Sequence, residues 1–293
     1  MKLSDALADF LLDGKARALS PKTLRAYNYN LERFIAYLER AGVRTLDDLL
    51  PTHIRGFLAG LQDRALSPYT IDQFYRSIKV FLRWCVRQDY LQKDPLRGIS
   101  RPQRPQRFVP RLSMEQVQEL LHILAEGEYF PERNLAMVAL LVDSGLRSSE
   151  LLNLDLADAQ VGLLRIVGKG NKERWVPLGE YTQRAVEDYL RVRGDHPDCP
   201  ALFVSRRGTR LGTQGIRLIL CKLREQMGIQ RLYPHLLRHT FANLYLCSEG
   251  DLRSLQLILG HADIQTTAMI YTAPNTRDLQ AKHRLHSPLS QIA

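Results

Sequence analysis

Residues 143–151 read Asp143-Ser144-Gly145-Leu146-Arg147-Ser148-Ser149-Glu150-Leu151, and this stretch decides the fold of the second half of the chain. The apolar run over 134–142 before it predicts a helix, and a turn containing Gly145 follows. The next helix is predicted to start near Ser148. The turn therefore carries Arg147 between two helices, and the second helix carries Glu150.

The segment after these helices predicts a short hairpin. Apolar and polar side chains alternate over Leu163–Val167 and over Glu173–Leu178, which is the period of a strand. Gly168-Lys169-Gly170-Asn171 connects the two strands. The rest of the chain is predicted to be mainly helical, with breaks at Arg206-Arg207-Gly208 and at Gly260. The fold class is therefore mainly α with a small β-sheet in the second domain.

Residues 1–100 are predicted to form a separate helical domain. Ser20 followed by Pro21 is a helix-start signal, because serine caps free backbone N–H groups and proline is accepted in the first turn. Ser67-Pro68 repeats this signal. Apolar residues follow each signal at helical spacing, beginning with Leu24 and Ile71. We expect two well-capped helices in the core of this domain.

The composition is that of a globular protein with a basic surface. The chain has 293 residues, 45% of them hydrophobic and 25% charged, with a net charge of +10 and a pI of 9.6. That length fits two ordinary domains, and the charge favours a polyanionic partner such as nucleic acid. Four scattered cysteines lack the spacing of a metal site or a disulfide framework. No apolar run is long enough to span a bilayer, and the acidic start does not resemble a signal peptide, so we expect a cytoplasmic protein.

Residues 101–111 are predicted to form the linker to a second domain over residues 112–293. Arginines and prolines are interspersed in this linker, as Arg101, Pro102, Arg104, Pro105, Arg107 and Pro110. Proline blocks regular structure and stiffens the segment, while the arginines keep it in solvent or against phosphate. A solvated charge run and a contact with a DNA backbone are both open interpretations. Ser113-Met114-Glu115-Gln116 then opens the second domain with a near capping box.

Six polar residues of the second domain together suit the cleavage of a phosphodiester: Arg147, Lys169, His235, Arg238, His261 and Tyr271. Arginine forks bind the non-bridging oxygens of a phosphate, and a tyrosine hydroxyl is able to attack phosphorus. A free phenol has a pKa of about 10, so the tyrosine must lose its proton to a neighbour during attack. Lys169, at the tip of the predicted hairpin, is placed to protonate the leaving oxygen. The resulting phosphotyrosine ester keeps most of the energy of the broken bond, so neither a metal nor ATP is implied.

Each of these residues also has a plainer interpretation. One arginine among 41 basic residues is usually a surface charge, and one tyrosine among 12 is usually a core residue. Lys169 and Lys172 both flank the hairpin tip, and spacing alone does not choose between them. The joint order of the six residues, rather than any single one, supports the phosphodiester interpretation.

That order resembles the tyrosine recombinases, the phage integrase family, and especially their Xer branch. Residues 143–151 resemble the first-arginine segment of the family, and Gly168-Lys169-Gly170-Asn171-Lys172-Glu173-Arg174 resembles the lysine hairpin. Pro234-His235-Leu236-Leu237-Arg238 matches the His-x-x-Arg box. Leu259-Gly260-His261 and Ile270-Tyr271-Thr272 match the second-histidine and nucleophile segments. The amino-terminal domain is similar to the helical core-binding domain of the family, so the resemblance covers nearly the whole chain.

The resemblance implies a role for each residue at the reacting phosphate. Tyr271 forms a 3′-phosphotyrosyl link, and Lys169 protonates the 5′ leaving hydroxyl. Arg147 and Arg238 clamp the phosphate, and His235 assists proton transfer at the tyrosine. These roles are carried over by analogy with the family.

Further roles surround this centre. His261 hydrogen-bonds the phosphate, and Glu150 braces the active-site side chains from behind. The family pattern selects Lys169 over Lys172 as the general acid. The remaining basic residues of the hairpin and the linker are expected DNA contacts, namely Lys172, Arg174, Arg101, Arg104 and Arg107.

The resemblance also implies partners. The expected substrate is double-stranded DNA with paired half-sites, bound by a homo- or heterotetramer on two duplexes. A carboxy-terminal tail over residues 276–289 holds such assemblies together in this family, and a frayed end is the plainer interpretation. No cofactor and no membrane partner are expected. Two other functions stay open: a relaxing enzyme of the type IB topoisomerase class, and a non-catalytic DNA-binding regulator on the same scaffold.

Overall fold

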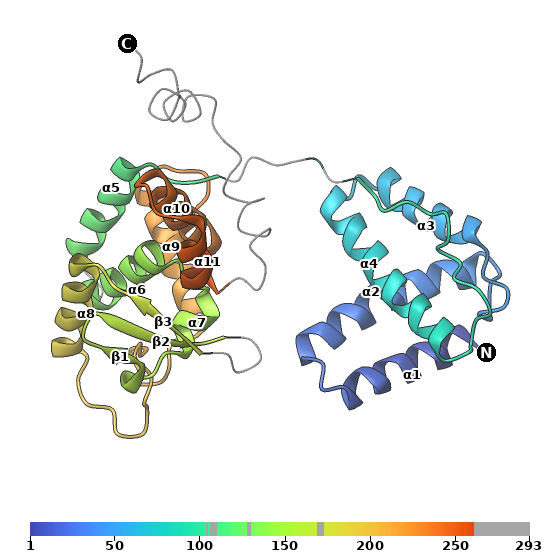
Figure 1. Ribbon diagram of the computed structural model, residues 1–293, viewed down its shortest axis with the longest axis horizontal. Coiled ribbons are helices and arrows are strands. Elements are labelled where there is room, and N and C mark those ends of the chain that lie inside the picture. Colours follow the sequence, from blue (N-terminus) through green and yellow to red (C-terminus); the bar gives the residue numbers. More distant parts are fainter. Residues whose placement is uncertain (104, 106–109, 128–129, 169–172, 261–293) are drawn as a thin grey trace, which may run out of the picture. The chain divides into compact units, whose positions relative to one another are not determined.

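The computed structural model describes residues 1–103, 105, 110–127, 130–168 and 173–260 (Figure 1). The chain divides into two compact units, Met1–Arg107 and Phe108–Ala293, each with its own hydrophobic core. Described helices dominate both units, and the second unit also contains a small sheet. The predicted fold class, mainly α with a small β-sheet and two domains, is confirmed.

The first unit is helical in its described part. Its helices are α1 (Leu3–Ala16), α2 (Pro21–Arg40), α3 (Pro51–Asp63) and α4 (Pro68–Arg87). The two predicted helix starts are confirmed, because the Ser20 hydroxyl accepts the backbone N–H of Thr23 at 3.1 Å and the Ser67 hydroxyl accepts that of Thr70 at 3.2 Å. Each serine satisfies a backbone donor that the first helical turn leaves unpaired.

Helix α4 holds the first part of the predicted linker against the first unit. The contacts are the Tyr75 hydroxyl to the Ile99 carbonyl at 3.2 Å, the Arg101 guanidinium to the Asp72 carboxylate at 2.5 and 3.1 Å, and the Tyr69 hydroxyl to the Pro105 carbonyl at 3.3 Å. Asp72 is fully buried and also pairs with Arg76, since a buried carboxylate requires such partners. Arg101 therefore has an intramolecular role that its sequence position does not reveal, and its DNA contact stays a prediction.

The second unit is built around helix α6. Its described helices are α5 (Met114–Ala125), α6 (Pro131–Ser144), α7 (Ser148–Asn153), α8 (Glu180–Val192), α9 (Thr213–Gln226), α10 (Pro234–Cys247) and α11 (Leu252–Leu259), with a 3-10 turn over Leu156–Asp158. Residues 136–141 of α6 are all buried, because α5, α8 and α10 pack around this helix. None of the helices in the described ranges has the length and apolar character to cross a membrane.

The sheet of the second unit is antiparallel, in the order β1 (Ala159–Gln160), β2 (Leu163–Val167) and β3 (Glu173–Pro177). Leu164 pairs with Val176, and Ile166 pairs with Arg174. Leu164, Ile166 and Val176 are buried, and the two-residue period places Arg174 on the same inward face. The two predicted strands are confirmed. Strand β1 was missed, because two residues are too few to show a period.

Candidate active site

A tight turn joins α6 to α7 and packs against α10 and α11. Gly145 ends α6 with a φ of 60°, in the left-handed region that favours glycine. A Cβ atom at this position would lie 2.5 Å from a ring carbon of Phe241 and 2.7 Å from a methyl carbon of Leu259. Only glycine therefore allows the turn to approach α10 and α11 so closely, and this approach places Arg147 beside them.

The turn is fastened by Arg238 of α10. This side chain is nearly completely buried, with 3% exposure. Its Nη1 donates to the Gly145 carbonyl at 2.6 Å, and its Nη2 donates to the Leu259 carbonyl at 2.8 Å. Arg238 is thus bonded to the turn two residues before Arg147.

Glu150 of α7 holds Arg147 in two ways. The carboxylate accepts the backbone N–H of Arg147 at 2.9 Å and its Nη1 at 2.7 Å. The Glu150 side chain is buried, whereas the Arg147 side chain keeps 37% of its surface exposed. Arg147 is therefore fixed from the protein side and accessible from the solvent side, which suits a phosphate ligand.

Arg174 of β3 binds Glu150 from the other side. Its Nη1 and Nη2 lie 3.1 and 2.9 Å from the two carboxylate oxygens, and its Nε donates to the Ile258 carbonyl at 2.8 Å. Only 14% of the side chain is exposed. Its place beside the hairpin predicts a DNA contact, but its contacts favour an internal role. The reason is the strand period, which turns residue 174 inward together with Val176.

These contacts determine the charge of Glu150. Burial alone would raise the pKa of this carboxyl, but the hydrogen bonds from Arg174 and from Arg147 outweigh burial and lower the pKa to about 2. The carboxylate therefore stays ionised between two guanidiniums across the whole neutral range.

His235, in the first turn of α10, lies close enough to Arg147 and Arg238 for their charges to affect it. Although it keeps solvent contact, desolvation by the surrounding protein lowers its pKa, and the charges of Arg238 and Arg147 lower it further. Burial and the neighbouring His235 and Arg238 lower the pKa of His239 to about 4. The His235 ring is therefore neutral at pH 7 and able to accept a proton. His239 received no role from the sequence, although its spacing of one helical turn from His235 is a usable signal.

Several predicted site residues lie outside the described residues: Arg104, Arg107, Lys169, Lys172, His261 and Tyr271. In sequence, Lys169 and Lys172 belong to the connection between β2 and β3, and His261 follows Gly260 at the end of α11. The described part of the site therefore comprises Arg147, Glu150, Arg174, His235 and Arg238. The accessible Arg147 guanidinium and the neutral imidazole of His235 suit the binding of a phosphate group, and the buried Arg238 guanidinium adds positive charge at the same turn.

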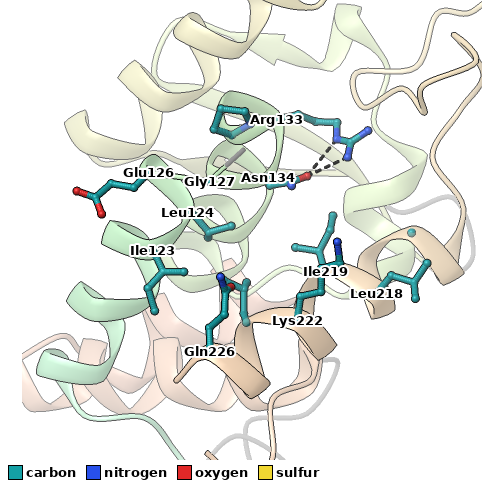
Figure 2. A pocket seen from close by; sticks show the side chains of 13 residues that line it. Ile123, Leu124, Glu126, Gly127, Arg133, Asn134, Leu218, Ile219, Lys222 and Gln226 are labelled. Atoms are coloured by element: carbon teal, nitrogen blue, oxygen red, sulfur yellow. Dashed lines mark hydrogen bonds between the residues drawn. The ribbon is translucent and has the colours of Figure 1, made fainter. Parts of the chain in front are cut away.

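A hollow of about 840 Å³ lies elsewhere in the second unit, between the end of α5, the start of α6 and one side of α9 (Figure 2). Its lining is largely apolar and includes Leu124, Leu218 and Ile219. Two polar residues of the lining are paired with each other, because Arg133 donates to the Asn134 side-chain oxygen at 3.2 and 3.0 Å. None of the described site residues lines it. The hollow therefore has no part in the chemistry at the arginine turn.

The depressed pKa of Glu150 leads to a prediction about stability. A carboxyl whose pKa falls from 4.5 to about 2 on folding contributes about 3 kcal/mol. This contribution is complete above about pH 4.5 and is lost as the pH falls toward 2. Glu150→Gln should therefore lower the free energy of unfolding at pH 7 by about 3 kcal/mol, and the difference from wild type should shrink to less than half by about pH 3.

Urea unfolding at the two pH values measures this difference. Glu173→Gln is the matched control, because Glu173 is half exposed and lies 3.8 Å from Arg165. Its effect should stay within about 1 kcal/mol at either pH. Equal stability of Glu150→Gln and wild type at pH 7 would show that the carboxylate does not hold the two arginines.

Comparison with known proteins covers both units. The model of the phage integrase family matches residues 110–277, and that of the phage integrase N-terminal SAM-like domain matches residues 9–89. Tyrosine recombinase XerC of Pseudomonas syringae pv. tomato is 38% identical over 259 residues, which are 87% of this chain and 86% of that protein. The crystal structure of XerA recombinase is 27% identical, with a TM-score of 0.55 over 97% of this chain and 99% of that one. XerH recombinase, bound to palindromic difH substrate, shares the fold at 22% identity, with a TM-score of 0.75 over 94% of this chain and 82% of that one.

Proposed function

This chain belongs to the phage integrase family, and on that premise we propose that it is a site-specific DNA recombinase acting through a 3′-phosphotyrosyl intermediate. One observation carries the proposal: Arg238 donates to the Gly145 carbonyl, two residues before Arg147, and His235 lies one turn before Arg238 on α10. Desolvation, and then the charges of the two arginines, lower the pKa of His235. Two guanidiniums and a neutral base on these neighbouring segments support cleavage of a phosphodiester by charge stabilisation and general base catalysis.

The proposed step exchanges one phosphate ester for another. The Tyr271 oxygen attacks phosphorus, its proton passes toward His235, and the bond from phosphorus to the 5′ oxygen breaks. Lys169 protonates that leaving oxygen. Arg147 and Arg238, with a hydrogen bond from His261, stabilise the charge on the non-bridging oxygens. Because the protein–DNA ester keeps the energy of the broken bond, a 5′ hydroxyl reverses the step without metal or nucleotide.

We assign the two units different parts in DNA binding. The first unit, which matches the SAM-like domain model, is proposed to bind the core of the recombination site, and the second unit is proposed to be catalytic. Residues 101–111 would connect them along the DNA backbone, which is consistent with the net charge of +10. Double-stranded DNA with paired half-sites is the proposed partner, and XerH carries difH DNA on this same fold.

A cleavage assay on DNA tests the proposal. A footprint of the purified chain on DNA flanking its own gene first defines a site, and a nicked duplex of that site is then incubated with the protein in EDTA. We expect a covalent adduct on a denaturing gel, and recombinant products from a plasmid that carries two sites. Relaxation of the plasmid without recombinants would identify a type IB topoisomerase activity. Specific binding without any adduct would identify a DNA-binding regulator.

The carboxy-terminal tail, outside the described residues, is proposed to hold the tetramer together. A chain truncated after Asn275 should bind a single duplex with unchanged affinity, because the two DNA-binding units remain. It should fail to pair two duplexes, which native gels and cross-linking of the synaptic complex measure. Unchanged pairing by the truncated chain would show that the tail is a frayed end.

A further inference from the structure

We propose that Arg174 is a positioning residue that joins three segments of the active site through one guanidinium. The inference rests on the proposed recombinase function and assigns Arg174 a role within it. Arg174 contacts α7 through Glu150 and α11 through the Ile258 carbonyl, and it belongs to β3 itself. In sequence, α7 directly follows Arg147, α11 and Gly260 precede His261, and β3 follows the segment that carries Lys169. These three residues are the proposed catalytic residues nearest to the elements that Arg174 joins.

The first connection runs from Arg174 to Arg147. Arg174 binds both oxygens of Glu150, and the same two oxygens accept the backbone N–H and Nη1 of Arg147. Both partners of the Arg174–Glu150 pair are buried, at 14% and 6% exposure. Glu150 alone could rotate within its own turn of helix. A second guanidinium fixes the plane of the carboxylate, and thereby the position of Arg147.

The second connection runs from Arg174 to the end of α11. Beyond the bond to the Ile258 carbonyl, the guanidinium lies flat against Gly260. A Cβ atom at Gly260 would be 2.9 Å from Nη1 and 3.0 Å from Cζ of Arg174. Gly260 also leaves the helix with a φ of 62°. The residue directly before His261 therefore packs closely against Arg174, and glycine suits both this approach and the positive φ.

The third connection is the strand itself. Arg174 pairs with Ile166 across β2 and β3, one position beyond Glu173, which starts β3. In sequence, the segment 169–172 that carries Lys169 lies immediately before Glu173. Arg174 is the inward-facing residue of β3 nearest to that segment, and its side chain is anchored to α7 and α11.

This position requires arginine rather than lysine. A planar guanidinium reaches two carboxylate oxygens and a carbonyl at once, whereas an ammonium is a single point charge. Arg174→Lys keeps the charge of the site and removes the fork. We expect the single-turnover rate of adduct formation on the nicked duplex to fall by about 10²-fold, because small displacements of reacting groups have effects of that order.

The salt dependence of DNA binding separates positioning from DNA contact. A residue that binds phosphate weakens DNA binding when it is replaced and lowers the salt slope by about one. Arg174→Gln removes the charge and is the variant for this comparison. We expect unchanged affinity and an unchanged salt slope, together with slow cleavage at saturating DNA. Weakened binding with a smaller slope and a normal rate at saturation would overturn the proposal and restore the DNA contact.

Two further variants complete the experiment. Arg165→Lys on β2 is the matched control, because Arg165 pairs with Asp158 at 2.8 Å and does not contact Glu150. Its cleavage rate should stay within about 3-fold of wild type.

In a Glu150→Gln background, Arg174→Lys should lower the cleavage rate much less than it does alone, since the two residues act as one unit. The melting temperature of each variant is measured, and every assay is run below its unfolding transition. Additive costs in the cycle would overturn the coupling through Glu150, whereas absence of an adduct in the wild type would overturn the proposed function instead.

Discussion

Replacing Tyr271 with phenylalanine is expected to abolish the covalent protein–DNA adduct and to leave DNA binding unchanged. The substitution removes only a hydroxyl, so the charges that bind the DNA backbone remain. Without the phenolic oxygen, however, no ester to phosphorus forms, and the remaining arginines have no nucleophile to assist. The adduct on the nicked duplex should therefore fall below detection, while gel-shift affinity stays within about 2-fold of wild type.

Tyr181→Phe is the matched control for this variant. Tyr181 lies on α8, is 54% exposed and has no proposed role, so its loss of a hydroxyl should not change adduct formation. An adduct formed by Tyr271→Phe at the wild-type rate would remove Tyr271 as the nucleophile.

Arg238→Lys should lower the rate of strand cleavage by about 10²–10³-fold, the usual effect of losing one donor to the charge that develops in the transition state. The variant also changes the contacts that hold the arginine turn in position. In wild type two separate guanidinium nitrogens bond the Gly145 and Leu259 carbonyls, whereas lysine carries its donors on a single nitrogen. We therefore expect the common anchor of the arginine turn and the end of α11 to weaken. Single-turnover cleavage at saturating DNA measures the effect on chemistry separately from binding.

A variant of a second buried arginine distinguishes an effect on catalysis from an effect on folding. Arg193, at 8% exposure, donates to backbone carbonyls such as those of Leu202 and Ala201, away from the arginine turn. Arg193→Lys should lower the melting temperature in the same manner as Arg238→Lys but cleave normally below its transition. Equal cleavage rates for both variants would show that Arg238 serves the fold alone.

Local signals in the sequence predicted the elements around this site. Serine before proline predicted the starts of α2 and α4, and Ser113 predicted the start of α5, because capping depends on side chains within one helical turn of each other. The turn at Gly145 and the strands β2 and β3 follow from equally local patterns. The bond from Arg238 to the turn that carries Arg147 has no local signal in the sequence; only the order of the motifs led us to expect the two arginines near each other.

The distant partners of the inward-facing arginines were beyond the reach of local patterns. Arg174 was assigned to DNA because basic residues near a hairpin tip usually face solvent, but its partners Glu150 and Ile258 are 24 and 84 residues away in sequence. Arg101 similarly pairs with Asp72 across 29 residues. The period of β3, with Val176 buried, was the one available sign that residue 174 points inward.

The linkage between protein and DNA provides the most direct measurement. The adduct trapped on the nicked duplex is digested with nuclease and trypsin, and the nucleotide-bearing peptide is sequenced by mass spectrometry. We predict one modified peptide, with the 3′ phosphate of the broken strand joined to the oxygen of Tyr271. A nucleotide attached to any other side chain, or joined through its 5′ phosphate, would contradict the proposed cleavage beside Arg147 and Arg238.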